Sequence, residues 1–166
     1  MFRSTQNTKC SQVSLTLNLL IARSDVLLFS VATLCPEKDA EPNTHVNYSD
    51  LGIPGMLPVL NEDCLDKAIR CALALGGRIP PFIKFDRKHY TYSDLPQGYQ
   101  ITQEHNPIMI DGRLFYYNHQ DAESHVLIKR VKMEQDAATT KINKDGRFMI
   151  DYNRAGVPLL EIGTEP

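Results

Sequence analysis

The clearest hydrophobic pattern in the chain lies in the segment 61–77. Its apolar side chains recur three and four positions apart, which is the spacing of one helix face. They are Leu65, Ala68, Ile69, Ala72 and Leu73. Asn61 is a suitable N-cap, and Gly76 and Gly77 close the segment. The sequence therefore predicts one amphipathic helix that buries a single face.

Downstream of this segment, apolar residues alternate with polar ones, which predicts β-strands. The segment 125–136 predicts one long strand. The dipeptides Asp111-Gly112 and Asp145-Gly146 favour tight turns, so we expect a β-hairpin around each of them. One helix beside several antiparallel strands predicts an α+β fold.

The N-terminal segment 1–24 differs in composition from the rest. It contains Arg3, Lys9 and Arg23 but no acidic residue, and it is rich in Ser and Thr. This composition favours an organellar presequence. A secretory signal and a buried first strand are the alternatives that the apolar run at 13–22 leaves open. Because that run is too short to span a bilayer, we expect no membrane partner.

Composition also limits the possible functions. The chain has 166 residues, 42% of them hydrophobic, which suits one globular domain. A net charge of −2 gives no field that would draw the whole chain to nucleic acid or to an anionic membrane. The four cysteines lack C-x-x-C spacing, which favours free thiols in a reducing compartment. The common phosphate-loop, dinucleotide and zinc motifs do not occur in the sequence.

Charged residues on two predicted strands are the candidates for chemistry. Alternation divides the end of the first strand into two faces. One face carries Lys132, Glu134 and Asp136, and the other carries Val131, Met133 and Gln135. On the second strand, Glu161 points away from Leu160 and Ile162. A carboxylate in this setting needs a cation, so Glu161 is either a catalytic acid or the partner of Arg154 or of a lysine.

Five ordered motifs give the chain a specific resemblance. They are E-P-N-T-H-V, P-G-x-L-P-V-L-N, F-D-R-K-H-Y-x-Y-x-D-L-P-x-G-Y-Q-I-T-Q, M-E-Q-D-A and D-Y-N-R-A-G-V-P-L-L-E-I-x-T-E-P. In this order they resemble the B subunit of aspartyl/glutamyl-tRNA amidotransferase over about residues 28–166. The M-E-Q-D form resembles the mitochondrial branch of the family, which favours a mitochondrial location and the presequence interpretation.

The resemblance implies a fold and a division of the chain. The fold would be a mixed, mainly antiparallel sheet with a packed helix, forming an incomplete cradle like that of glutamine synthetase and guanido kinases. Residues 28–166 would be the N-terminal part of the catalytic domain, about the first third of a typical member. Residues 1–27 would be a mitochondrial presequence or a divergent first strand.

The implied activity is the correction of glutamate attached to glutamine tRNA. The B subunit would use ATP and Mg²⁺ to phosphorylate the side-chain carboxylate of Glu-tRNA(Gln), and ammonia released from glutamine in the A subunit would displace the phosphate. Phosphorylation is needed because ammonia cannot expel oxide from a free carboxylate. The A and C subunits and the tRNA are therefore the implied partners.

The motifs also imply site residues. The catalytic and metal-binding acid of L-L-E-I falls on Glu161, and the second acid of M-E-E-D falls on Gln135, whose amide oxygen is a neutral ligand for Mg²⁺. The cofactor-binding motif D-R-K-x-Y matches Asp86, Arg87, Lys88 and Tyr90. Arg87 and Lys88 would join Glu161 in catalysis by neutralising the transferring phosphate. The whole stretch 86–103 would form a wall of the phosphate and glutamyl cavity.

The sequence departs from the family pattern in two places. The Glu-x-His pair of the first strand falls on Leu17 and Leu19, and the lysine of M-E-x-D-A-G-K is lost after Ala138. Three hypotheses follow: a fragment of the catalytic subunit, a non-catalytic assembly module of the same complex, and an independent RNA-binding module. The last would use a basic cluster of Lys129, Arg130, Lys132, Lys141, Lys144 and Arg147.

Overall fold

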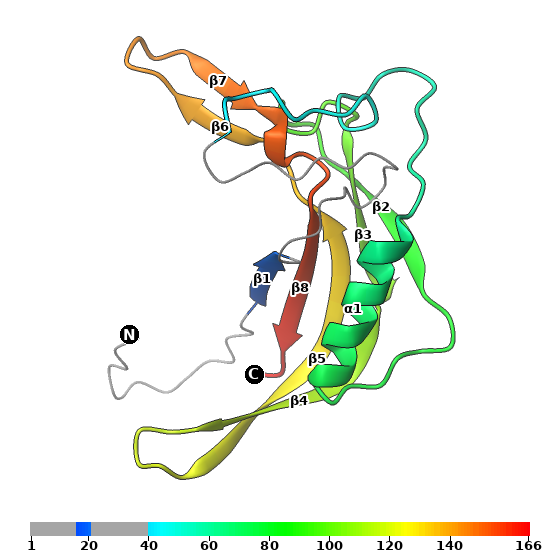
Figure 1. Ribbon diagram of the computed structural model, residues 1–166, viewed down its shortest axis with the longest axis vertical. Coiled ribbons are helices and arrows are strands. Elements are labelled where there is room, and N and C mark those ends of the chain that lie inside the picture. The colour runs from blue at the N-terminus through cyan, green and yellow to red at the C-terminus, as the bar shows by residue number, and fades with distance from the viewer. Residues whose placement is uncertain (1–15, 21–39) are drawn as a thin grey trace.

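The computed structural model describes residues 16–20 and 40–166 (Figure 1). The elements in chain order are β1 (Thr16–Leu20), α1 (Glu62–Ala74), β2 (Lys84–His89), β3 (Tyr99–Asn106), β4 (Met109–Tyr117), β5 (Glu123–Gln135), β6 (Thr139–Ile142), β7 (Phe148–Asp151), the 3₁₀ turn η1 (Tyr152–Arg154) and β8 (Pro158–Thr164). Within the described part of the chain, no helix is long and apolar enough to cross a membrane.

A four-stranded sheet with the order β1-β8-β5-β4 forms the centre of the molecule. Every pairing in this sheet is antiparallel, as are the pairings of the two separate hairpins, β2–β3 and β6–β7. Strand β8 therefore lies inside the sheet, with β1 on one side and β5 on the other. The β4–β5 and β6–β7 hairpins extend toward opposite ends of the long axis (Figure 1).

Helix α1 is the predicted amphipathic helix, which the structure confirms. The Asn61 side chain caps it by accepting a hydrogen bond from the Asp63 amide. Its buried residues are small, namely Cys64, Ala68 and Ala72, so the helix backbone lies close to the sheet. Beyond Leu75 the chain turns at Gly76, whose φ of 63° favours glycine. Cys64 is buried and forms no disulfide, as the sequence led us to expect.

The core between α1 and the sheet comes from one face of β5 and one face of β8. Val131 lies opposite Ile162, and Met133 lies opposite Leu160, and all four belong to the same buried cluster. Truncating Met133 or Leu160 to alanine would cost about 2–5 kcal/mol by leaving a cavity. The predicted alternation of β5 and β8 is thus confirmed, and it sends Lys132 and Glu161 away from this core.

The prediction of a hairpin at Asp111-Gly112 is wrong. These residues lie inside the continuous strand β4, and the turn that follows is at 118–122. Asp111 has a φ of 58°, but the strand continues because Ile110 and Gly112 on either side of it stay paired with β5. A Cβ on Gly112 would overlap the end of Met109 and lie 3.2 Å from the Leu75 carbonyl oxygen. The glycine therefore serves close packing rather than a turn.

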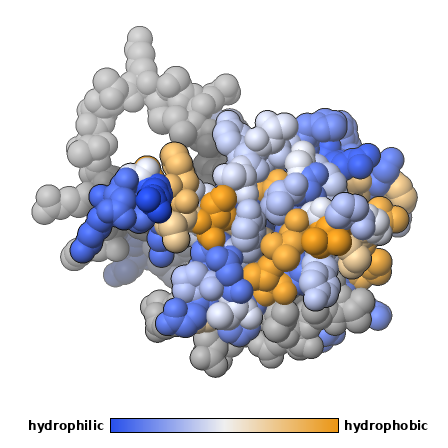
Figure 2. All heavy atoms as spheres, turned by 90° about the horizontal axis from the view of Figure 1, so that it is seen from above, coloured by the Kyte–Doolittle hydropathy of each residue, from blue (hydrophilic) through white to orange (hydrophobic). Residues whose placement is uncertain are grey.

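The expected hairpin at Asp145-Gly146 is confirmed, because it joins β6 to β7. The turn closes through the Asn143 amide, which donates to the Arg147 carbonyl. This hairpin exposes large apolar side chains, as does the segment 48–59. They are Ile142, Phe148 and Met149 on the hairpin, and Ile53, Met56, Leu57 and Val59 on the segment. Figure 2, which views the molecule from above, shows apolar side chains exposed among hydrophilic ones.

Part of the predicted presequence region lies in the described structure. Residues 16–20 form β1, and this strand includes Leu17 and Leu19, where the family would place its Glu-x-His pair. Its register puts Asn18 opposite Glu161. The other residues of 1–27 lie outside the described residues, so the presequence remains a prediction.

Candidate active site around Glu161

Glu161 is held on an interior strand by its neighbours on both sides. It lies on β8 directly opposite Lys132 of β5, and its Oε2 is 3.1 Å from the Lys132 Nζ. The Lys132 side chain is only 7% exposed and that of Glu161 is 21% exposed. Of the salt bridges that the sequence offered for Glu161, the structure therefore shows the one to a lysine. Arg154, the other expected partner, pairs with Asp136 instead.

Lys132 contacts a second carboxylate, which the sequence did not indicate. Its Nζ lies 3.2 Å from Oε2 of Glu104, a residue of β3 that packs across β5. Arg130 contacts the same carboxylate at 2.9 Å through Nη2, and its Nη1 donates to the Glu104 carbonyl oxygen. Burial raises the pKa of Glu104, but hydrogen bonds from Arg130 and Lys132, together with their charges, outweigh it and hold the pKa below its ordinary value.

Gln135 does not join Glu161. It follows Val131 and Met133 on the core face of β5, whereas Glu161 pairs with Lys132 on the opposite face. Its backbone carbonyl accepts a hydrogen bond of 3.0 Å from the Gln100 side chain. The structure thus separates the two metal ligands that the resemblance implied.

The contact between β3 and β5 carries several buried polar groups. The Gln103 Oε1 accepts a hydrogen bond from the Met133 amide at 2.9 Å. The Nε2 atoms of Gln103 and Gln135 and the Thr102 hydroxyl are buried without a hydrogen-bond partner. Each such group costs free energy relative to a satisfied one. Polar side chains are therefore present along the contact between β3 and β5, from Glu104 to the buried Gln135.

Asp86 and its neighbours lie on β2, beside β3. The Asp86 Oδ2 accepts hydrogen bonds from the amides of Glu104 and His105 and contacts the His105 ring, at 2.9, 3.1 and 3.2 Å. These contacts lie where the β2–β3 register shifts, between Lys84 and Asp86. The hydrogen bond from the His105 amide is the largest cause of a lowered Asp86 pKa, opposed by burial and aided by the other two contacts. Asp86 thus fixes the bulge that sets the direction of β2.

Arg87 and Lys88 are exposed cations at the end of this hairpin. The Arg87 guanidinium lies 5.4 Å from the centroid of the Tyr99 ring, and the Lys88 ammonium lies 5.8 Å from that of Tyr90. Lys88 also reaches Gln100 at 3.4 Å, which connects it to Gln135. Tyr90 has a raised pKa, caused first by burial and then by the charge of Asp94 and other neighbouring groups.

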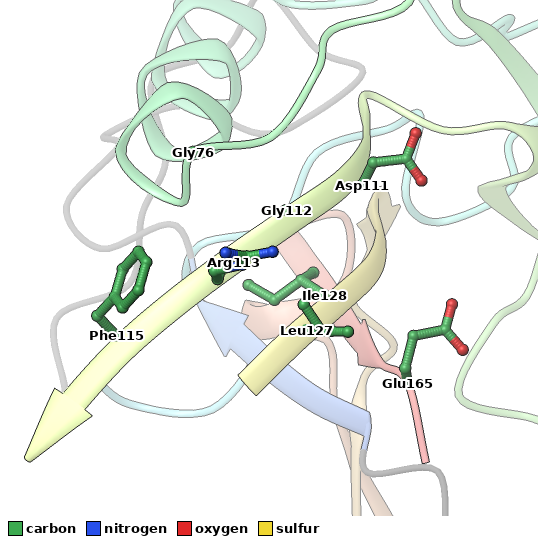
Figure 3. A pocket seen from close by; sticks show the side chains of 8 residues that line it. All are labelled: Gly76, Asp111, Gly112, Arg113, Phe115, Leu127, Ile128 and Glu165. Atoms are coloured by element: carbon green, nitrogen blue, oxygen red, sulfur yellow. The ribbon is translucent and has the colours of Figure 1, made fainter. Parts of the chain in front are cut away.

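A pocket of the described structure lies elsewhere. It has a volume of about 560 Å³ and opens along the β4–β5 hairpin. Its lining consists of Gly76, Asp111, Gly112, Arg113, Phe115, Leu127, Ile128 and Glu165 (Figure 3). None of the residues that the motifs imply for the site lines this pocket. The expected cavity wall at 86–103 therefore remains a prediction.

The basic cluster proposed for RNA binding does not form one surface. Lys132 is buried between two carboxylates, and Arg130 is paired with Glu104. Lys141, Lys144 and Arg147 lie on the separate β6–β7 hairpin and its turn. The structure therefore gives no support to the independent RNA-binding module.

The residues present do not fit a magnesium ion. Among the described residues, no three His, Cys, Asp or Glu side chains are grouped to hold a metal. Glu161 and Glu104 offer the oxygen ligands that Mg²⁺ prefers, but the Lys132 ammonium lies between them. The sequence did not predict that Lys132 lies between two glutamates, because this depends on the packing of β3 across β5. The one signal in the sequence was that alternation places Lys132 on the same face of its strand as Glu134 and Asp136.

Comparison with known proteins identifies the family. A family model described as "GatB/GatE catalytic domain" matches residues 23–166. The aspartyl/glutamyl-tRNA(Asn/Gln) amidotransferase B subunit of Ehrlichia ruminantium is 46% identical over 143 residues, covering 86% of this chain and 29% of the relative. The mitochondrial glutamyl-tRNA(Gln) amidotransferase B subunit of Laccaria bicolor is 47% identical over 140 residues, covering 84% of this chain and 26% of the relative.

The chain thus spans less than a third of the length of these curated relatives. The match includes β2 to β8, and with them the carboxylate of Glu161, the cations of β2 and the buried polar contact of β3 with β5. Since the family model covers most of the sequence, the chain belongs to the GatB/GatE catalytic domain family.

Proposed function

We propose that this chain is the N-terminal part of the catalytic domain of a glutamyl-tRNA(Gln) amidotransferase B subunit. The enzyme would form Gln-tRNA(Gln) from misacylated Glu-tRNA(Gln). The observation that supports this most strongly is the family match over residues 23–166, together with a relative named for this activity at 47% identity.

The chemistry of the site residues agrees with carboxylate activation. ATP would convert the glutamyl carboxylate into an acyl phosphate, which gives ammonia a good leaving group. Arg87 and Lys88 are exposed, so their charges are free to meet the phosphates of ATP. Asp86 holds the strand that carries them, and Tyr90 packs beneath the Lys88 ammonium.

Magnesium is the second cofactor that the resemblance implies. The described residues do not fit it, because Glu161 is paired with Lys132 and Gln135 lies on the opposite face. No step is therefore assigned to the metal. What Glu161 itself supplies is a half-buried, oriented carboxylate within a balanced network of charges.

The proposed partners are the A and C subunits, with glutamine-derived ammonia arriving from the former. The names of the two reported relatives, each given as a B subunit, support a complex of several chains. We place the complex in mitochondria, because one relative is named mitochondrial and the N-terminal composition favours a presequence.

A second candidate function is a non-catalytic assembly module of the same complex. The observation that favours it is the Lys132–Glu161 ion pair, which engages the carboxylate expected to be catalytic. The exposed aromatic side chains of the β4–β5 hairpin, Phe115, Tyr116 and Tyr117, offer apolar area for docking.

Reconstitution distinguishes these functions. The chain is co-purified with the A and C subunits, and ATP-dependent conversion of Glu-tRNA(Gln) to Gln-tRNA(Gln) is measured against those two subunits alone. Conversion above that background supports the catalytic function. Stable retention without conversion supports the assembly module. A chain that the A and C subunits do not retain contradicts both.

A further inference from the structure

Lys132 is enclosed by carboxylates that come from two different strands. Its Nζ lies 3.1 Å from Oε2 of Glu161 on β8 and 3.2 Å from Oε2 of Glu104 on β3. We propose that the Lys132 ammonium is the resident cation of this site, occupying the position between Glu104 and Glu161 where a divalent metal would otherwise bind. The inference rests on the proposed function only for the importance of Glu161, and its test does not require amidation.

The charges of this network already balance. Two carboxylates, Glu104 and Glu161, are joined by two cations, Arg130 and Lys132, so the four groups sum to zero. A divalent cation added to them would meet two positive charges at close range. Because Lys132 is buried, this repulsion is screened less than it would be on the surface. The intact network should therefore exclude Mg²⁺ rather than recruit it.

The position of Lys132 also makes its ammonium difficult to displace. The residue lies within β5, whose backbone is paired with β8 at this point, and its side chain is 7% exposed. A metal would have to move the ammonium away from both carboxylates, either into the interior or out past Glu104. Mg²⁺ loses its bound water reluctantly, so the free energy gained by binding two carboxylates would not offset the cost of displacing the ammonium.

Removing the lysine should reverse this preference. In Lys132→Met the side chain keeps nearly the same length but loses its charge, so Glu161 is left without a cation while Glu104 keeps Arg130, and the network carries a net charge of −1. Two carboxylates in that arrangement attract a hard divalent cation. Metal binding in this variant would reveal that the ammonium had been occupying the cation position.

The experiment uses Mn²⁺ as the probe and the purified 166-residue chain. Binding is followed by the electron paramagnetic resonance signal of free Mn²⁺, and melting temperature is measured with and without the metal. We expect no Mn²⁺-dependent change in the wild type. Lys132→Met should have a lower melting temperature that Mn²⁺ partly restores, and an affinity for Mn²⁺ at least about tenfold higher than that of the wild type.

Two further variants make the assignment specific. Lys132→Met combined with Glu161→Gln should lose the gained affinity, because one of the two carboxylates is gone. Lys129→Met applies the same change to an exposed lysine of the same strand and should behave like the wild type. A wild-type chain that binds one Mn²⁺ through Glu161 would overturn the proposal, as would a folded Lys132→Met variant without gained affinity.

The wild type alone provides a test if Lys132→Met does not fold. A buried, paired ammonium gives a slowly exchanging Nζ–H signal in ¹⁵N-resolved NMR spectra. We expect the Lys132 signal to persist unchanged at millimolar Mg²⁺. Its loss or displacement by Mg²⁺, while an exposed lysine such as Lys129 is unaffected, would show that the metal replaces the ammonium and would refute the proposal.

Discussion

The carboxyl group of Asp50 lies directly against the α-carbon of Gly156, two residues before β8 begins. A Cβ added to Gly156 would overlap the Asp50 side chain, and the glycine has a φ of +79°. Its amide also donates to the Asp136 carbonyl, so the backbone cannot easily move away. We predict that Gly156→Ala lowers the free energy of unfolding by about 2 kcal/mol or more, measured by urea denaturation.

Gly146 provides a matched control for this substitution. Its φ of +77° is nearly the same, but an added Cβ would meet nothing within 4 Å. Gly146→Ala therefore isolates the backbone cost, which should be about 1 kcal/mol. The combined variant Gly156→Ala with Asp50→Ala should regain part of the loss. Equal losses at the two glycines would show that Asp50 is not the cause.

The same Asp50 predicts a dependence of stability on pH. Burial raises its pKa from 3.8 to about 7, against a smaller lowering by Ser49, and its Oδ2 is buried without a hydrogen-bond partner. A raised carboxyl pKa means that the folded state holds a proton which the unfolded state has lost. Stability is thus fully present below pH 3.8 and decreases as the pH rises to about 7.

Asp50→Asn should remove this dependence. The amide is neutral at every pH, so the variant should be more stable than the wild type at pH 8, by at most about 4 kcal/mol, and close to it at pH 4. Urea denaturation between pH 4 and pH 8 measures the difference. Asp121→Asn, at an exposed turn, should retain the wild-type profile. Parallel profiles for Asp50→Asn and the wild type would show that the carboxyl is not protonated.

Hydrophobic patterns predicted the elements whose partners are local or whose period is regular. Helix α1 and strand β5 follow directly from periodicity, and the β6–β7 turn follows from its Asp-Gly dipeptide. The same dipeptide misled at Asp111-Gly112. There the glycine is required by the side chain of Met109 in the same strand and by the Leu75 carbonyl, which comes from a segment far away in sequence.

The site could be predicted only in part, because some of its contacts also join segments that are far apart in sequence. Alternation placed Glu161 away from the core, and its need for a cation followed from elementary electrostatics. Which cation it has depends on the β5–β8 register and on the packing of β3 across β5, which bring Lys132 and Glu104 to it. Neither the register nor that packing is encoded in a local pattern.

We expect the Asp86 carboxylate to keep the β2–β3 hairpin ordered. Its lowered pKa arises first from the hydrogen bond with the His105 amide, so the charged form is bound more favourably in the folded state than in the unfolded one. Stability from this carboxylate is therefore present above its unfolded pKa and is lost as the pH falls through the lower folded value. We predict that the His105 and Glu104 amides exchange hydrogen faster at low pH than at neutral pH, after correction for intrinsic rates.

Asp86→Ala should produce the same faster exchange at neutral pH. The two amides lose their acceptor, and the bulge that directs Arg87 and Lys88 loses its anchor. Asp86→Asn keeps an acceptor oxygen without the charge, so its amide exchange rates should lie between those of the wild type and those of Asp86→Ala. The amides of β6 and β7 serve as internal controls, since they pair with each other in a separate sheet. Unchanged exchange at His105 in Asp86→Ala would contradict the anchoring role.

The final prediction concerns Glu161 in the assembled enzyme. Glu161→Gln keeps the shape of the side chain but removes its charge, while Lys132 retains Glu104 as a partner. We therefore expect a modest loss of stability, about 1–2 kcal/mol. If Glu161 acts in carboxylate activation, ATP-dependent amidation of Glu-tRNA(Gln) should be abolished. Glutamine hydrolysis should persist, because the proposed function assigns that chemistry to the A subunit.

Asp136→Asn is the matched control for this variant. The Asp136 side chain is also 21% exposed and also pairs with a cation, Arg154. A purely structural role for Glu161 would make the two variants alike, each losing some stability and amidating at a rate that follows its folded fraction. A catalytic role makes them differ, because only Glu161→Gln loses amidation while it remains folded. Melting temperature, amidation and glutamine hydrolysis measured on the same preparations decide between these outcomes.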